Sequence, residues 1–280
     1  MRVYKYMSLE NFKKTVIGGR LFLKASRPSE FNDPYEGKGV IEGEPSIGFA
    51  REWLDEFSLW DIVNESDSAD RESLIKIVCR ANMKGQFDWF GFFDDILRVV
   101  CFSDPKVLSQ TGSDLLMWSH YADSGRGVRL EIELEDQQFP VKQVRYRDLR
   151  PRLDLGHVEH CDASRDKPFA EYLCDCVLTK PKVWHYEQEM RLVLFLSQGL
   201  EHLRYVSPLE QYKPLSKRDY VLEIPGECLK EITLGPKVDH VGDAQERMKA
   251  IRNDGFANVS FKRAMFGDDY AYKYVNLFNE

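Results

Sequence analysis

The 280-residue sequence lacks several features that would assign it to a common class of protein. It has no apolar run long enough to span a bilayer, and its start, MRVYKYMSLENF, has no basic segment followed by an apolar one. Basic residues are not in excess, since the formal net charge is −7. We therefore expect a cytoplasmic protein with no membrane partner and no global nucleic-acid-binding surface. Basic residues do cluster between Lys142 and Arg152, where a solvated strand edge and loop would account for them.

Signatures of the common nucleotide-binding and hydrolase folds are also missing. There is no phosphate loop of the form G-x-x-x-x-G-K-[ST], no G-x-G-x-x-G, no H-E-x-x-H and no G-x-S-x-G. The six cysteines have irregular spacings that match no standard zinc site, in a chain too large to need disulfides. We expect reduced thiols, no bound metal, and an active site built from separated segments.

The patterns that are present predict one α+β domain over residues 1–280. Apolar residues make up 43% and aromatic residues 12% of the chain, enough for a substantial core. Helical periodicity predominates from about 47 to 97, whereas most other apolar segments are typical of strands. Regular βαβ alternation is missing. We therefore predict a split, mostly antiparallel sheet with a helical lobe inserted at about 47–97.

Individual elements follow from the same periodicities. Further helices are expected at 8–17 with Ser8 as N-cap, at 114–122 with Ser113 as N-cap, at 167–178 and at 241–251. Strands are expected at 2–6, 20–24, 98–103, 128–134, 141–146, 187–196, 220–224, 231–234, 257–263 and 270–275.

The strongest local signal for a functional site is WHYEQEMRLVLFL, residues 184–196. A strand with a period of two would place Glu187, Glu189 and Arg191 on one face and apolar residues on the other. Carboxylates two residues apart on a strand lie about 7 Å from each other, so they can share a small ligand. A surface charge ladder is the common alternative for this pattern. The nearby Trp184 could stack on an aromatic ligand or pack in the core.

A second signal is a helix followed by a glycine turn in SDLLMWSHYADSGRGVRLEIEL, residues 113–134. Helical spacing places His120 and Tyr121 on one side and Trp118 on another. His120 could act as a general base, donate a hydrogen bond to a ribose, or be a satisfied and partly buried side chain.

A third signal is the polar turn FNDPYEG, residues 31–37. Asn32 and Asp33 precede a proline and can hydrogen bond to the backbone of the turn, which would account for them structurally. The same fixed turn could instead present Asn32, Asp33 or Glu36 to a ligand, because sites are commonly built on polar loops held by a scaffold.

Several motifs taken together resemble an uncharacterised bacterial family, the domain of unknown function twenty-nine seventy-one. The motifs are YKYMS, FNDPYE, CFS, LMWSHYADSGRGV and W-x-Y-E-x-E-x-R, in that order. The resemblance runs from Tyr4 to about Val193, and LKEITLGPKVD extends it toward the C-terminus. Membership implies no established reaction.

A second resemblance concerns mechanism. The order of the expected elements is similar to that in ADP-ribosyltransferases. It runs from a strand and a short helix to a G-x-L strand with a polar loop, then to a strand ending in serine and a strand led by E-x-E. The similarity implies an NAD-dependent ADP-ribosyltransferase-like enzyme, such as a toxin or phage-defence effector, with NAD as substrate in the cleft of a split sheet. Lys5, Ser103 and Glu189 would take the first-strand, serine and catalytic positions, and Glu187 would orient the acceptor. The other NAD-binding residues that it implies are Tyr6, Asn32, Asp33, Trp118, His120, Tyr121, Trp184 and Arg191.

Two other interpretations stay open. In one, Asp33, Glu36, Glu187 and Glu189 hold divalent cations in a nuclease or another hydrolase. In the other, an aromatic cleft binds a nucleotide without turnover, as in a sensor module. The expected small-molecule partner is a nucleotide, and the sequence leaves the acceptor macromolecule open.

Overall fold

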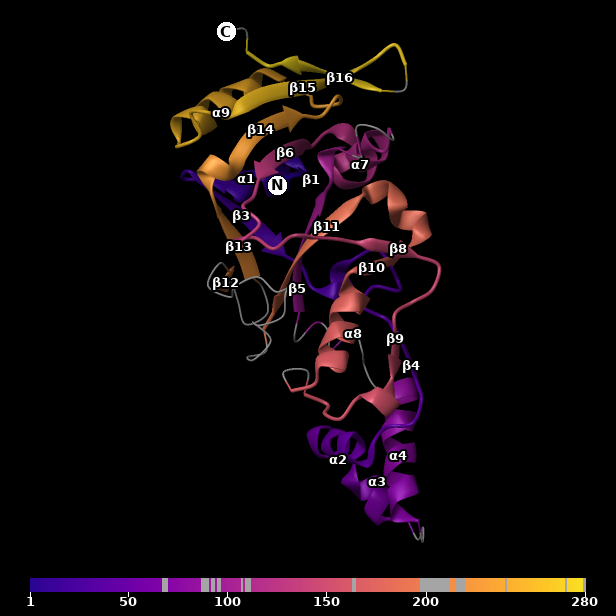
Figure 1. Cartoon of the computed structure of the whole chain (residues 1–280). Helices are drawn as coiled ribbons and strands as arrows, with labels where there is room; N and C mark the ends of the chain where they lie inside the picture. The colour runs from indigo at the N-terminus through magenta and orange to yellow at the C-terminus, as the bar shows by residue number, and fades with distance from the viewer. Residues whose placement is uncertain are drawn as a thin grey trace.

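The main sheet combines strands from both ends of the chain (Figure 1). In the computed structural model the strands lie in the order β16 (Tyr272–Asn276), β15 (Ser260–Phe266), β14 (Leu229–Leu234), β6 (Val128–Glu133), β1 (Arg2–Met7), β5 (Leu97–Ser103), β11 (Glu189–Phe195) and β7 (Lys142–Gln143). Among the described strands of this sheet, β14 and β15 are the one parallel pair, and α9 (Val241–Asn253) joins them. The structure describes residues 1–66, 70–86, 91, 94, 97–106, 108, 112–162, 165–196, 212–214, 220–239, 241–269 and 271–278.

A second sheet lies beside the first. Its strands, all antiparallel, are β12 (Tyr212–Pro214), β13 (Tyr220–Pro225), β3 (Arg20–Ala25) and β2 (Val16–Ile17). A bridge between Ser26 and Val99 connects the end of β3 to β5. Two parallel pairs complete the strands: β10 (Thr179–Pro181) with β8 (Arg145–Arg147), and β4 (Val40–Glu42) with β9 (Arg152–Asp154). The predicted α+β class with a mostly antiparallel sheet is confirmed.

Three helices form a lobe at one end of the molecule (Figure 1). They are α2 (Ile47–Glu56), α3 (Trp60–Asn64) and α4 (Arg71–Ala81), and a π-helical turn (Asn82–Gln86) follows. They lie within the predicted insertion at 47–97, of which residues 67–69, 87–90, 92–93 and 95–96 are outside the described part. The apolar stripe predicted at 167–178 forms α8 (Lys167–Val177), which packs against the lobe.

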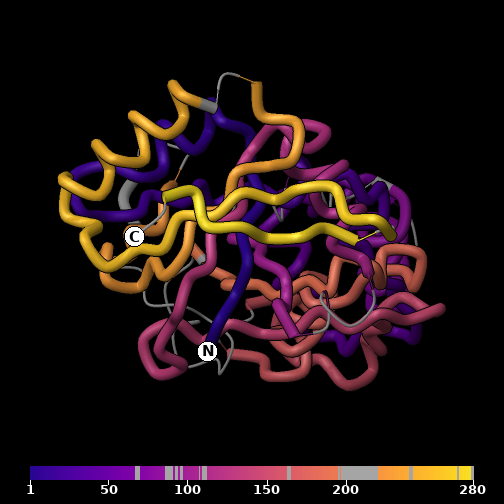
Figure 2. Tube along the Cα trace, turned by 90° about the horizontal axis from the view of Figure 1, so that it is seen from above, coloured from indigo at the N-terminus to yellow at the C-terminus, as the bar shows by residue number. Residues whose placement is uncertain are grey.

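The strands β5 and β11 are buried on both faces, which explains their almost continuous apolar sequence. Val100 and Phe102 of β5 pack into the core between the two sheets, which α1 (Leu9–Thr15) and α9 also contact. Leu97 and Val99 face the opposite way, into the core shared with α8 and the lobe. Seen from above, β15 and β16 cross the molecule with α9 beside them (Figure 2).

Some predicted boundaries are wrong. The helix expected at 8–17 is capped by Ser8 as predicted but ends at Thr15, because the β-branched pair Val16–Ile17 joins the second sheet as β2. The strand expected at 141–146 breaks at Val144 into β7 and β8. Helix α7 (Asp114–Tyr121) receives no capping hydrogen bond from the side chain of Ser113.

The strand expected at 187–196 begins only at Glu189. Glu187 closes the 3₁₀ segment η5 (Lys182–Glu187), and Gln188 has a left-handed backbone with φ of 45°. Glu187 and Glu189 therefore do not alternate along one strand. Of the other strand expectations, Tyr270 lies outside the described residues, and β15 begins at Ser260 rather than at 257.

Candidate active site

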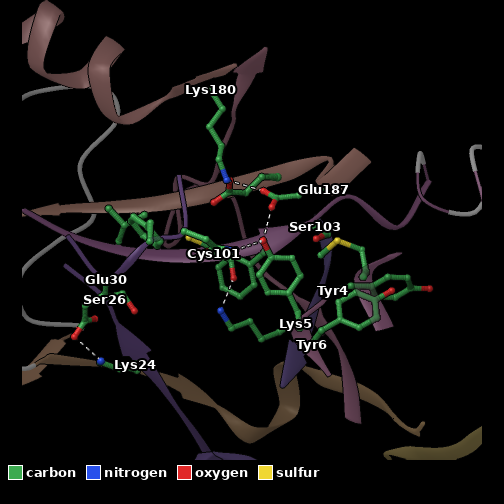
Figure 3. A pocket seen from close by; sticks show the side chains of 17 residues that line it. Tyr4, Lys5, Tyr6, Lys24, Ser26, Glu30, Cys101, Ser103, Lys180 and Glu187 are labelled. Atoms are coloured by element: carbon green, nitrogen blue, oxygen red, sulfur yellow. Dashed lines mark hydrogen bonds and ion pairs between the residues drawn. The ribbon is translucent and has the colours of Figure 1, made fainter. Parts of the chain in front are cut away.

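A cavity of about 230 Å³ opens between the two sheets (Figure 3). Its walls come from β1, the end of β3 and the loop after it, β5, α7, and the segment from Lys180 to Glu189. Polar side chains that line it include Lys5, Ser103 and Tyr121. The cavity thus collects groups from segments far apart in the sequence.

Three neighbouring strands supply one end of this cavity. Ser103, at the end of β5, is paired with Tyr4 of β1 on one side and with Glu189 of β11 on the other. Lys5 donates from Nζ to the carbonyl oxygen of Cys101 at 2.7 Å, and burial lowers the pKa of its ammonium group. The three residues assigned by the transferase resemblance, Lys5, Ser103 and Glu189, all line the same cavity.

Lys180 links the two glutamates of the E-x-E motif. Its Nζ lies 2.7 Å from Oε2 of Glu187 and 3.0 Å from Oε2 of Glu189, and all three side chains are buried (Figure 3). None of the sequence motifs predicts Lys180 as part of the site. Nothing in LTKPK distinguishes Lys180 from the exposed Lys182 two positions later.

Glu189 is also bound from behind by Arg191. The guanidinium donates from Nε to Oε1 of Glu189 at 2.8 Å and holds both carboxylate oxygens of Glu36. Arg191 is 0% exposed and Glu36 1% exposed, so the surface charge ladder is the wrong interpretation. Arg191 does not line the cavity, and its predicted role as a ligand-binding residue is replaced by support of Glu189.

The two glutamates have opposite pKa shifts. Burial raises the pKa of Glu187, and the neighbouring Glu189 adds to this effect while Lys180 opposes it. Burial would also raise the pKa of Glu189, but Arg191 and Lys180 outweigh it and hold that pKa well below its usual value. Two carboxylates with divergent pKa values are a common basis for a fixed anion beside a proton carrier.

Tyr121 holds Glu187 from the other side, and Asn32 in turn holds Tyr121. The Tyr121 hydroxyl donates to Oε1 of Glu187 and accepts from Nδ2 of Asn32 at 3.2 Å. Helix α7 and the FNDPYEG turn therefore meet at the Tyr121 hydroxyl, which links the turn to the Glu187 carboxylate. Asp33 itself is buried and accepts from the backbone N–H of Tyr35 at 3.0 Å, as expected for a side-chain turn, and is not part of the cavity wall.

The other predicted aromatic residues differ in whether they line the cavity. Trp118 is fully buried and donates from Nε1 to the Tyr274 hydroxyl at 3.3 Å, so it packs in the core rather than stacking on a ligand. Tyr6 lines the cavity and donates from its hydroxyl to Asp114. Neither His120, which is exposed, nor the half-buried Trp184 lines the cavity, although the Trp184 ring lies 5.0 Å from Lys180 Nζ.

Three of the four carboxylates considered as metal ligands are paired with cations of the protein, and the fourth, Asp33, accepts the backbone N–H of Tyr35. Glu36 is bound by Arg191, Glu187 by Lys180, and Glu189 by both. Within the described part of the chain, no three His, Cys, Asp or Glu side chains are grouped to hold a metal ion. The six cysteines are all free thiols.

The low pKa of Glu189 makes the stability of the fold pH-dependent. The unfolded chain protonates this group near 4.5 and the folded chain only at much lower pH, so the ion pairs stabilise fully above 4.5 and less as the pH falls below it. Wild type should therefore melt at a higher temperature than Glu189→Gln, and this difference should become smaller as the pH is lowered from roughly 5 to 3. Glu187→Gln is the control: because the pKa of Glu187 is raised above 4.5, its difference in melting temperature from wild type should change in the opposite direction, and at pH values above 4.5. Parallel shifts in both variants would contradict these pKa directions.

Comparison with known proteins assigns the chain to no group, since no family model, curated protein or solved structure matches it. None of the described helices is both long and apolar enough to cross a membrane. The geometry and charges of the cavity are therefore the basis for inferring a function.

Proposed function

We propose that this protein is an ADP-ribosyltransferase-like enzyme that uses NAD as its substrate. The supporting observation is that Lys5, Ser103 and Glu189, which lie on three neighbouring strands, line one cavity between two sheets. The transferase resemblance uses these same three positions in the same chain order. The two glutamates of the E-x-E motif lie at one Lys180 ammonium, within reach of a shared ligand.

The size of the cavity fits part of NAD. Pockets for drug-sized ligands usually measure about 300–1,000 Å³, and this one is smaller, about 230 Å³. In this proposal the nicotinamide and its ribose enter the cavity, and the rest of the dinucleotide stays at the rim. The Tyr121 ring in the wall offers a surface for stacking, and Lys5 places a positive charge nearby for a phosphate or hydroxyl oxygen.

The chemistry follows from the opposite pKa shifts of the two glutamates. The bond between ribose and nicotinamide breaks, and its electron pair leaves with the nicotinamide. Positive charge builds on the ribose, where the carboxylate of Glu189, kept ionised and held in place by Arg191 and Lys180, stabilises it. Glu187 then takes the proton of the acceptor nucleophile as the new bond to the ribose forms. Lys180 fixes the position of both carboxylates.

A specific observation favours a second candidate function, a nucleotide-binding module without turnover. Lys180 and Arg191 already neutralise much of the negative charge of Glu189. A neutralised carboxylate stabilises a positively charged transition state less well. Binding of NAD without release of nicotinamide would select this function over the transferase.

Glu187→Gln separates the two roles that we assign to the motif. With adenylate-labelled NAD and cell lysate, we expect wild type to release nicotinamide and to transfer the label. The variant should lose roughly a hundredfold in label transfer because its general base is gone. It should lose less than about tenfold in nicotinamide release, which precedes proton transfer, because water then adds to the ribose cation and gives its proton to the solvent. Nicotinamide release is followed by chromatography and transfer by gel.

The matched control is Glu10→Gln, an exposed glutamate on α1 whose loss should change neither reaction. An equal loss of both reactions in Glu187→Gln would contradict the assigned role of Glu187. Failure of the wild type to release nicotinamide at high enzyme concentration would rule out the transferase.

A further inference from the structure

The basic segment that follows β8 forms a groove beside the cavity. Two adjoining hollows of about 310 and 580 Å³ share the wall made by residues 147–151, in the connection from β8 to β9. This connection curves outward beside β10 (Figure 1). Lys180 lines both the smaller hollow and the cavity described above. We call the two hollows together the arginine groove.

The groove is also connected to the site through hydrogen bonds. In the pairing of β8 with β10, Tyr146 lies opposite Lys180. The Tyr146 hydroxyl accepts the backbone N–H of Glu189 at 2.8 Å. The next residue along the chain is Arg147, which lines the groove. The groove therefore begins one residue away from the hydrogen bond between Tyr146 and Glu189.

The charge of the groove is positive although the chain is acidic overall. Arg147 and Arg150 are exposed, and neither takes part in an ion pair among the described residues. The acidic Asp148 between them is paired with Lys182. Two arginines on one short loop match the repeated phosphates of a polymer, since each guanidinium can bind a phosphate with two hydrogen bonds.

Exposed apolar side chains lie next to these arginines. Tyr35 is 54% exposed and Leu149 is 68% exposed, and both line the smaller hollow. The Arg150 guanidinium lies 5.7 Å from the centre of the Tyr35 ring. Proteins that bind single-stranded nucleic acid combine a basic groove with rings on which bases stack. An acidic peptide would use the arginines but would gain little from the ring.

We propose that the arginine groove binds single-stranded nucleic acid and leads it to the cavity as the acceptor. The role as acceptor depends on the proposed transferase function, whereas the binding itself does not. A nucleic-acid base or terminal phosphate in the cavity would lie beside Glu187, the group that accepts the proton.

Binding is tested by fluorescence anisotropy with labelled single-stranded RNA and DNA of about 20 nucleotides, longer than one binding site. We expect Arg147→Glu/Arg150→Glu to weaken binding at least about tenfold, and the slope of log affinity against log salt to fall by about 1.4 for two lost phosphate contacts. Tyr35→Ala should weaken binding by about fivefold or more, and Tyr35→Phe should not, because stacking needs only the ring.

The control is Lys13→Glu/Lys237→Glu, which makes the same change in net charge at exposed positions outside the groove. The proposal is overturned if neither oligonucleotide binds wild type, if the two double variants weaken binding equally, or if polyglutamate competes as well as RNA. Nicotinamide release is measured in parallel. If nicotinamide is released but no oligonucleotide binds, the proposed role of the groove is refuted and the transferase function is not. If oligonucleotides bind in a way that depends on the two arginines but no nicotinamide is released, the role of the groove is supported and only the transferase function is refuted.

Discussion

Replacing Arg191 by methionine is expected to lower the free energy of unfolding by about 3–5 kcal/mol, the usual cost of breaking a buried ion pair from one side. Arg191 lies fully buried between Glu36 and Glu189, and methionine keeps most of its apolar volume. The loss therefore comes from two carboxylates left in the interior without their shared cation. Urea denaturation followed by circular dichroism measures it.

Arg145→Met is the matched control for this change. Arg145 forms an ion pair with Asp175 at 2.5 Å, but both side chains are at least 40% exposed, so its loss should cost less than about 1 kcal/mol. Adding Glu36→Gln to Arg191→Met should recover part of the lost stability, because one of the two uncompensated charges is removed. Equal effects of the two single arginine variants would show that Arg191 does not hold the buried charges.

Much of the fold could be predicted because the burial of a strand determines how apolar residues are spaced in its sequence. The alternating VRLEIEL and the apolar RVVCFS occur as β6 and β5, close to the expected bounds. Boundaries were less predictable where a turn depends on a single backbone conformation. Nothing in YEQE reveals that Gln188 takes a left-handed backbone, so the periodicity wrongly extended β11 to Glu187.

The site was predictable only in part, for a related reason. Local periodicity indicates the face on which a side chain lies but not its partner from a distant segment. Lys5, Ser103 and Glu189 were identified through chain order, and the structure brings them to one cavity. Lys180 comes from a three-residue strand with no period of its own. Trp118, which the transferase resemblance implies as an NAD-binding residue, is a core side chain.

Glu189→Gln is expected to slow nicotinamide release by about a hundred- to a thousandfold, as for other groups that stabilise transition-state charge. The amide keeps the size of the carboxylate and removes the negative charge that faces the ribose. Affinity for NAD should change much less, since the ribose becomes positively charged only as the bond breaks. Single-turnover kinetics measures the rate, and calorimetry of NAD binding measures the affinity.

Destabilisation must be separated from lost catalysis in this variant. Glu231→Gln is the control, since Glu231 is also buried and is paired with Arg129 at 3.1 Å and Lys262 at 2.6 Å, but it does not line the cavity. It should reduce stability and leave the rate per folded molecule unchanged. A Glu189→Gln rate within about threefold of wild type would contradict the assigned transition-state role.

The pH dependence of wild type supports the same assignment independently. Because Arg191 and Lys180 keep Glu189 ionised, nicotinamide release should stay constant as the pH falls toward 4.5 in the folded protein. As the pH is lowered, label transfer should instead decline before release does. Burial raises the pKa of Glu187, and a protonated Glu187 cannot accept a proton. Two glutamates with separate roles give two different pH profiles for release and transfer, so coincident profiles under conditions where transfer is rate-limiting would contradict the separate roles.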